Sequence, residues 1–135
     1  MSETVLEIHL SNLRHNYTFL RKQLSANTKL LAVVKAFGYG SDAIEAAKCL
    51  VSQGVDYFGV AYVQEGVNLR KAGIKTPILV LHPQLSNLDE LIEHKLEASV
   101  YCQPILDAML LKIKELNVSH YPVHLKFNTG LNRLG

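Results

Sequence analysis

Residues 29–40 read KLLAVVKAFGYG, and this stretch determines the fold that the sequence predicts. The near-continuous apolar run at residues 29–35 is typical of a strand buried on both faces, as strands of parallel sheets are. A glycine-rich loop at residues 38–40 follows the run. Residues 42–53 then carry apolar side chains at helical spacing, and Gly54 is a typical residue to end that helix. The stretch therefore predicts a strand, a loop and a helix in succession.

The same alternation continues along the chain in both directions. Upstream, residues 5–10 are predicted to be extended and Ser11 to cap a helix. The apolar face of that helix would contain Leu13, Tyr17, Leu20 and Leu24. Downstream, we expect strands at residues 57–62, 77–81, 98–101 and 121–127, and helices at residues 64–72, 88–95 and 104–116.

Apolar strands that alternate with helices predict an α/β fold with a parallel sheet. The regular spacing of the strands suits successive units of a (β/α)₈ barrel, but a complete barrel takes about 250 residues. This chain has 135 residues. We therefore expect an incomplete parallel (β/α) barrel with about five of the eight strands. Residues 1–135 would form part of a truncated, TIM-barrel-like N-terminal domain.

The composition excludes several classes of protein. The formal net charge is +2, and no basic stripe is interleaved with aromatic residues, so we expect no nucleic-acid partner. The apolar runs are too short to span a bilayer, and the first residues lack the features of a signal peptide. Cys49 and Cys102 lie far apart, and the six histidines show no metal-binding spacing. A cytoplasmic protein with no metal and no membrane partner is expected.

Lys35 closes a wholly apolar strand, at the end of the sheet where α/β proteins place their functional residues. Burying its charged form there is costly, and the neutral amine is a nucleophile suited to Schiff-base chemistry. The alternative is that the side chain simply extends into solvent. This position alone leaves both interpretations open.

The glycine loop also matches another kind of site. Residues 38–43 fit the pattern G-x-G-x-x-A between a strand and a helix, which is a dinucleotide-binding fingerprint. Glu65 follows at about the separation expected of a ribose-binding acidic residue. Such a short pattern of small residues is common by chance. An ordinary loop, or a loop that receives the phosphate of some other ligand, fits the pattern equally well.

Two cations lie near the end of the last predicted strand. Lys126 is in that strand, and Arg133 follows after an Asn-Thr-Gly turn, so both side chains could face the same mouth at the strand ends. A guanidinium in that position is suited to a carboxylate or a phenolate oxygen. Two solvated cations are the alternative.

Together these segments resemble the signatures of one enzyme family. Residues 33–40, VVKAFGYG, resemble the cofactor-lysine signature of the alanine racemases, and residues 124–135, HLKFNTGLNRLG, resemble a second long motif of that family. Residues 7–17 and the GI and PILVL segments within residues 73–81 are also similar to family sequences. The resemblance runs the whole length of the chain, and two long motifs in the right order make it specific.

The resemblance implies an enzyme that uses pyridoxal 5′-phosphate to racemise L-alanine to D-alanine for peptidoglycan synthesis. Lys35 would bind the cofactor covalently and act as a base on one face of the substrate. Tyr39 would hydrogen-bond the cofactor phosphate, and Leu81 would pack near the pyridine ring. Arg133 would contact the phenolic oxygen and the substrate carboxylate. Lys126 would be the lysine that is carbamylated in many members of the family, where the new negative charge orients the residue that corresponds to Arg133.

The family also implies parts that this chain lacks: the rest of the barrel, a C-terminal β domain and, in the homodimer, a tyrosine from the partner subunit. We therefore expect the isolated chain to be inactive or nearly so. We also expect it to self-associate through the apolar edge at residues 121–127, or to be disordered near its C-terminus.

The chain departs from the family pattern at a few positions. Phe37-Gly38 replaces Asn-Ala, Ser41-Asp42 replaces His-Gly, and Asn128 replaces an aspartate. None of these changes removes an implied catalytic group, although a hydrogen bond at Asn128 is expected to differ. Two other functions stay open: a racemase of broad amino-acid specificity, and a non-catalytic pyridoxal-phosphate-binding protein of the same barrel group.

Overall fold

The computed structural model describes residues 4–135, which fold into a parallel sheet with helices. The strands are β1 (Leu31–Val33), β2 (Tyr57–Val60), β3 (Ile78–Val80), β4 (Glu97–Val100) and β5 (Val123–Leu125). The helices are α1 (Leu10–Lys22), α2 (Lys35–Gly40), α3 (Ala43–Ser52), α4 (Val63–Lys71), α5 (Leu88–Glu93) and α6 (Gln103–Glu115). A 3₁₀ turn, η1 (Leu85–Asn87), precedes α5.

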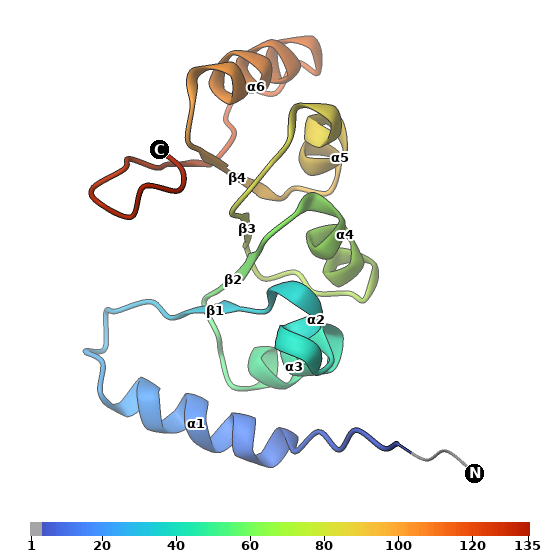
Figure 1. Cartoon of the computed structure of the whole chain (residues 1–135), viewed down its shortest axis with the longest axis vertical. Coiled ribbons are helices and arrows are strands. Elements are labelled where there is room, and N and C mark those ends of the chain that lie inside the picture. The colour runs from blue at the N-terminus through green and yellow to red at the C-terminus, as the bar shows by residue number, and fades with distance from the viewer. Residues whose placement is uncertain (1–3) are drawn as a thin grey trace.

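The five strands lie in one sheet in the order β1-β2-β3-β4-β5, and every neighbouring pair is parallel. Each strand therefore pairs with the strand that precedes it in the chain, as in successive βα units of a barrel. Figure 1 shows α3, α4, α5 and α6 along one side of this sheet, with α1 beneath α3. The predicted α/β architecture with five parallel strands is confirmed.

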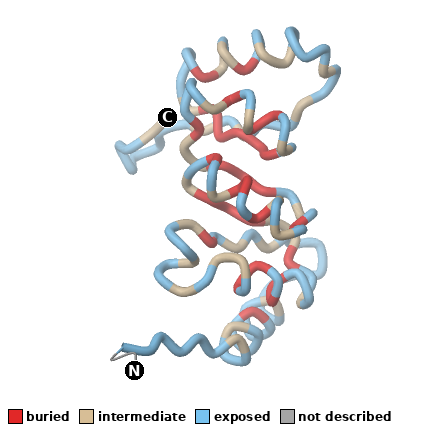
Figure 2. The backbone as a smooth tube through the Cα atoms, turned by 90° about the vertical axis from the view of Figure 1, so that its right-hand side faces the viewer, coloured by how far each residue is buried: buried red, intermediate tan, exposed pale blue. Residues whose placement is uncertain are grey.

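The core lies between the sheet and these helices. Alternate strand residues point toward the helices, and Phe58, Val60, Ile78, Val80 and Ala98 are each at most 1% exposed. They meet buried helix residues that include Ala47, Val67, Leu91 and Met109. Figure 2 shows this buried material concentrated in the middle strands and the inner faces of the helices.

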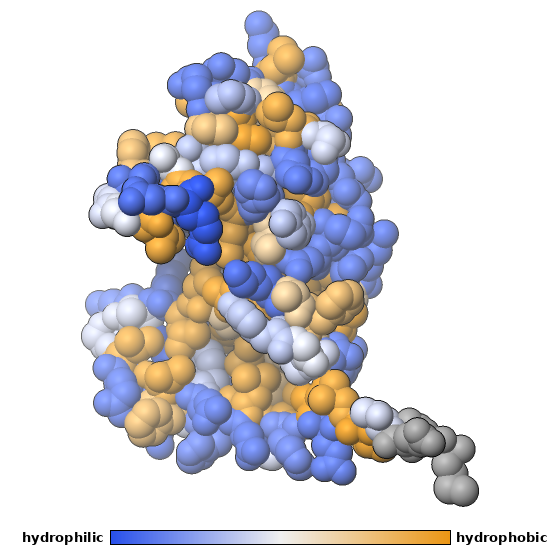
Figure 3. All heavy atoms as spheres, viewed as in Figure 1, coloured by the Kyte–Doolittle hydropathy of each residue, from blue (hydrophilic) through white to orange (hydrophobic). Residues whose placement is uncertain are grey.

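The other face of the sheet has no helix of residues 4–135 over it and is called the open face, although Leu79 and Ser99 on its middle strands are buried. In β1, Leu31 and Val33 are 40% and 36% exposed, whereas Val34, on the helix side, is 4% exposed. The prediction that the first strand is buried on both faces is therefore wrong, because helices cover only one face of the sheet. Hydrophobic side chains gather along the open side in Figure 3, within a hollow beneath the projecting C-terminal loop.

The predicted elements are present, with shifted ends. β1, β2, β3 and β5 are shorter than their apolar runs, because the outer residues of each run turn out of the hydrogen-bonded ladder, whereas β4 keeps the predicted length and begins one residue earlier, at Glu97. Ser11 does not cap α1: the His9 carbonyl already accepts from the Asn12 amide at 3.0 Å, so the helix begins at Leu10. On the face predicted for this helix Tyr17 is buried and Leu13 partly so. Leu20 is exposed, and Leu24 lies beyond the last turn.

Asp42 caps the N-terminus of α3. Its Oδ1 accepts hydrogen bonds from the Ile44 and Glu45 amides at 2.9 and 3.0 Å, so α3 begins at Ala43. Gly54, just beyond the helix, has a φ of +80°, as expected of a glycine that ends a helix. No helix of residues 4–135 is both long enough and apolar enough to cross a membrane.

Candidate active site

Lys35 is separated from the end of β1 by Val34 and begins α2, at the carboxyl edge of the sheet. Its neighbour Val34 packs into the core, and the backbone leaves the extended conformation at Val34, where ψ is 24°. The lysine side chain is half-buried. The chain thus presents a primary amine at the mouth of the half-barrel, which is the edge where (β/α) barrels carry out chemistry.

The backbone after Lys35 has an unusual conformation. Ala36, Phe37, Gly38 and Tyr39 all have φ between 51° and 66° and ψ between 38° and 54°, so α2 is a turn of left-handed helix. Left-handed geometry costs about 1–2 kcal/mol for each residue other than glycine, and it normally occurs at single positions. Four left-handed residues in succession, three of them not glycine, mark a strained segment, and strain of this kind concentrates at functional sites.

Specific hydrogen bonds hold the turn. The Gly38 amide donates to the Val34 carbonyl at 3.1 Å, and the Ser41 hydroxyl donates to the Gly38 carbonyl at 2.7 Å. From the next βα unit, Glu65 Oε1 accepts from the Ala36 amide at 2.7 Å. A β carbon added at Gly38 would lie 2.8 Å from the Ser41 hydroxyl oxygen, so glycine is the residue that fits there.

Glu65 also disproves the dinucleotide interpretation of the glycine loop for this structure. Its second oxygen, Oε2, accepts from the Ala61 amide at 2.7 Å and from the Tyr62 amide at 3.2 Å. Both carboxylate oxygens are therefore engaged by the backbone, and neither is directed to a ribose. The glycine loop forms the left-handed turn instead of a phosphate-binding entrance to α3.

Tyr39 ends the turn with its ring 67% exposed. The Lys35 Nζ lies 5.9 Å from the centroid of this ring, so the amine and the phenol share one side of the loop. Tyr39 also lines a cavity of about 390 Å³ between α1 and β1. The loop therefore presents a nucleophile and a hydrogen-bond donor together.

The ends of β2, β3 and β4 carry an aromatic cluster beside Leu81. Leu81 is partly buried, and its amide donates to the Val60 carbonyl at 2.8 Å. The His82 ring stacks on Tyr101 with centroids 5.5 Å apart and meets the edge of Tyr62 at 5.7 Å. Burial raises the pKa of Tyr101, whose hydroxyl donates to the Pro83 carbonyl at 3.1 Å.

After β5 the chain forms a loop closed by Asn128. The Asn128 Oδ1 accepts from the Gly130 and Asn132 amides at 3.1 and 3.0 Å, and its Nδ2 donates to Asn132 Oδ1 at 2.8 Å. Lys126 is half-buried, whereas Arg133 is exposed and lines a hollow of about 420 Å³ with Tyr101 and Cys102. The amide of Asn128 thus makes a donation that an aspartate cannot make.

The predicted site residues share one edge of the sheet, but only some of them interact. Lys35, Leu81 and Lys126 follow β1, β3 and β5, whose carboxyl ends line this edge. Lys35 and Tyr39 face each other. Within residues 4–135, no hydrogen bond or ion pair joins Arg133 to Lys126, or either cation to Lys35.

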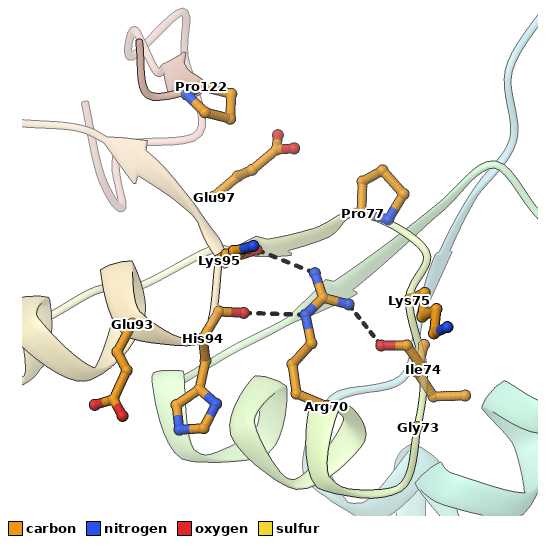
Figure 4. A pocket seen from close by; sticks show the side chains of 10 residues that line it. All are labelled: Arg70, Gly73, Ile74, Lys75, Pro77, Glu93, His94, Lys95, Glu97 and Pro122. Atoms are coloured by element: carbon orange, nitrogen blue, oxygen red, sulfur yellow. Dashed lines mark hydrogen bonds between the residues drawn. The ribbon is translucent and has the colours of Figure 1, made fainter. Parts of the chain in front are cut away.

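The opposite, amino edge of the sheet has a different character. The Arg70 guanidinium donates to four backbone carbonyls: Ile74 at 2.8 Å, Thr76 at 2.7 Å, His94 at 3.1 Å and Lys95 at 3.0 Å. Burial lowers the pKa of this group. Figure 4 shows the guanidinium at the centre of a cavity of about 620 Å³ between the loops that follow α4 and α5.

A polar cluster lies above this edge on the open face. Glu97 is 9% exposed, and its Oε2 accepts from the Tyr57 hydroxyl and lies 2.8 Å from His124 Nε2. The rings of Tyr57 and His124 also meet edge to face, with centroids 5.8 Å apart. The cluster joins β2, β4 and β5 across the inner side of the sheet.

A match to a family model shows the protein family of the chain. Residues 8–135 match the model described as alanine racemase, N-terminal domain. The chain belongs to the alanine racemase family. The resemblance inferred from the sequence motifs is therefore confirmed.

Alanine racemases from several bacteria are similar to the chain over nearly its whole length. Alanine racemase 1 of Caldanaerobacter subterraneus subsp. tengcongensis is 39% identical over 98% of the chain, and the alanine racemase of Treponema denticola is 38% identical over 100%. The solved alanine racemase of Clostridium difficile 630 superposes with a TM-score of 0.91 at 35% identity, covering 99% of the chain. The chain spans 34%, 36% and 36% of these three proteins, about a third of each.

In this alanine racemase domain the sequence located the lysines but missed the geometry that positions the first of them. Nothing in the local sequence indicated a left-handed turn, since alanine, phenylalanine and tyrosine rarely adopt that conformation. Glu65 was singled out as a ribose ligand, and its actual role had a recognisable signal. It lies three residues after Tyr62, where a glutamate commonly reaches back to a helix N-terminus.

Proposed function

We propose that the protein containing this chain interconverts L-alanine and D-alanine with pyridoxal 5′-phosphate as its cofactor, and supplies D-alanine for peptidoglycan. The family supports this proposal, since alanine racemases as a family depend on that cofactor. The observation that carries it is Lys35, an amine held at the carboxyl edge of the sheet by a strained turn.

The side chains at this edge have the chemistry that the cofactor requires. A half-buried primary amine suits an aldehyde, and an exposed guanidinium suits a phenolate or carboxylate oxygen. The phenol of Tyr39, whose ring centroid lies 5.9 Å from the amine, suits a phosphate. The donor set therefore fits pyridoxal phosphate. When bound, this cofactor supplies an electron sink for the carbanion at the substrate α-carbon.

Each residue of the chain then has a role. Lys35 would hold the cofactor through its amine, and the same amine, when free of the cofactor, would remove or return the proton on one face of the substrate α-carbon. Tyr39 donates a hydrogen bond to the phosphate, and Leu81 packs against the ring of the cofactor. Arg133 neutralises the phenolic oxygen and orients the substrate carboxylate. Lys126, when carbamylated, carries a negative charge that holds Arg133 in place.

The partners proposed for the protein are a small amino-acid substrate and a second copy of itself. The Clostridium difficile racemase has been solved in complex with cycloserine, which supports a site for a small molecule. For the 135-residue chain we propose self-association, since Leu125 of β5 is 64% exposed and the order of the sheet leaves β5 at its edge. Sedimentation velocity should show a concentration-dependent species that Leu125→Lys reduces, and a strictly monomeric wild type would contradict this part.

We also assign the protein to the cytoplasm. Cys49 is buried and Cys102 is exposed, and both are free thiols. Free thiols persist in a reducing compartment, whereas secreted domains of this size commonly carry disulfides.

The proposed function is tested by the visible absorption spectrum after pyridoxal phosphate is added, followed by borohydride reduction and peptide mapping. We expect a band, with the reduced adduct on Lys35, and we expect Lys35→Ala to abolish both. Lys29→Ala, which removes an exposed lysine just before β1, is the matched control and should leave both unchanged. A band that persists in Lys35→Ala, or an adduct spread over surface lysines, would contradict the role of Lys35.

A further inference from the structure

Glu65 is the residue through which the second βα unit reaches the turn that carries Lys35. It lies in the first turn of α4 and is partly buried. Its carboxylate accepts three backbone hydrogen bonds, from Ala36, Ala61 and Tyr62, at 2.7, 2.7 and 3.2 Å. All three donors lie at the carboxyl edge of the sheet, where β1 and β2 end.

Two of these bonds are local and the third is not. The bonds from Ala61 and Tyr62 satisfy amides just before α4, which is the ordinary work of an acidic residue in the first turn of a helix. The bond from Ala36 joins residues that are 29 apart in sequence. A helix cap alone does not require it.

The Ala36 amide lies where the left-handed turn begins. Ala36 is the first of the four left-handed residues, and it follows Lys35 directly. A left-handed alanine persists only where the surrounding structure opposes its return to ordinary geometry. The carboxylate does this through a short charge-assisted hydrogen bond, a type of bond that is roughly twice as strong as its neutral equivalent.

We propose that Glu65 is a positioning residue for Lys35. Its carboxylate holds the Ala36 amide in place and thereby sets the direction of the neighbouring Lys35 side chain. This inference rests on the proposed function of Lys35. Without the carboxylate, the Ala36 amide bonds to water, the turn samples other conformations, and the amine is no longer held for attack on an aldehyde.

The first test needs no cofactor and uses hydrogen exchange of the Ala36 amide. We expect Glu65→Gln to speed this exchange by about tenfold or more, the size expected for loss of a hydrogen bond to a charged group. Asp42→Asn is the matched control, because Asp42 is also a carboxylate at a helix start but bonds only to amides of its own helix. Equal exchange in wild type and Glu65→Gln would overturn the proposal.

A second measurement on the unaltered protein covers the case in which Glu65→Gln does not fold. The Ala36 amide proton should resonate far downfield, as expected of a short bond to a carboxylate. An Ala36 amide proton at an ordinary chemical shift would overturn the proposal.

The third test connects the contact to Lys35. The rate at which pyridoxal phosphate forms a borohydride-trapped adduct on Lys35 should fall about tenfold in Glu65→Gln and stay unchanged in Asp42→Asn. An unchanged rate in Glu65→Gln would overturn the positioning role. If wild-type Lys35 formed no adduct, the proposed function would fail, whereas the exchange result would still show whether Glu65 holds the turn.

Discussion

The two edges of the sheet differ in the hydrogen bonding and the conformation of their loop backbones. At the amino edge, one guanidinium, that of Arg70, satisfies four carbonyls in two loops. At the carboxyl edge, Ala36, Phe37 and Tyr39 hold left-handed geometry, and Phe37 is 81% exposed. Left-handed residues occur singly at the amino edge, as at Lys95, whereas four follow one another at the carboxyl edge, beside Lys35.

The contrast shows that this domain tolerates backbone strain in the loop after Lys35. Strain on an exposed loop would be removed easily by substitution if stability alone mattered. The presence of strain next to Lys35 agrees with a site that has to orient one side chain. The two loops at the amino edge need only to be held together, which the hydrogen bonds of Arg70 do. The contrast can be tested by changing each edge in turn.

The largest effect is expected at the amino edge. Arg70→Ala removes the donors of four carbonyls that are partly shielded from water, and should lower the free energy of unfolding by about 3 kcal/mol. Urea denaturation followed by circular dichroism measures this change. Lys71→Ala, at the next and exposed position, should change the same free energy by less than about 0.5 kcal/mol. Equal effects of the two substitutions would remove the contrast between the edges.

A second effect should appear at alkaline pH. Burial, with a smaller contribution from the hydrogen bond to Glu97, raises the pKa of Tyr57 to about 12. A phenol in the unfolded chain titrates near pH 10, so the folded state holds this proton more tightly. The stabilisation is fully present below about pH 10 and is lost as the pH rises toward 12.

Tyr57→Phe isolates this contribution. The difference in unfolding free energy between wild type and variant should shrink by about 1 kcal/mol between pH 9.5 and pH 12, with the size reduced because Tyr57 is partly exposed. Chemical denaturation at several pH values measures it. A difference that is constant with pH would show that folding does not raise the pKa of Tyr57.

A pair of glycine substitutions compares the same backbone geometry at both edges. Phe37 and Lys95 are both exposed and have φ of 54° and 51°. Replacing either with glycine should raise the free energy of unfolding by about 0.5 kcal/mol, since relief of the left-handed strain exceeds the added flexibility of the unfolded chain. Only Phe37→Gly should change the rate of adduct formation on Lys35, because Phe37 lies in the turn that follows this lysine and Lys95 does not. If both variants labelled at the wild-type rate, the strain would have no connection with the site.

The smallest effect is expected at Asn128. Asn128→Asp removes the donation to Asn132 Oδ1 but strengthens the two bonds accepted from the Gly130 and Asn132 amides. The two changes oppose each other, so the free energy of unfolding should change by less than about 0.5 kcal/mol. Thermal unfolding at neutral pH checks this. A large loss of stability would mean that the Asn128–Asn132 bond is essential to the loop.

Features that depend on local pattern could be predicted from the sequence. The apolar runs located all five strands, and the periodicity of residues 42–53 located α3, because burial of one face imposes those patterns. Ser11 was assigned wrongly as a cap because several residues near a helix start satisfy the same rule. The left-handed turn depends on a carboxylate 29 residues away, and no local pattern contains that contact.

The order of the strands has a consequence for how the chain is made. Since each strand pairs with the one before it, the sheet can grow by one βα unit at a time as the chain leaves the ribosome, N-terminus first. Glu65 follows β2 closely, so the turn after β1 can be fastened once α4 has emerged. The side chain of Lys35 would then be oriented early in synthesis, before β3, β4 and β5 are available to pair.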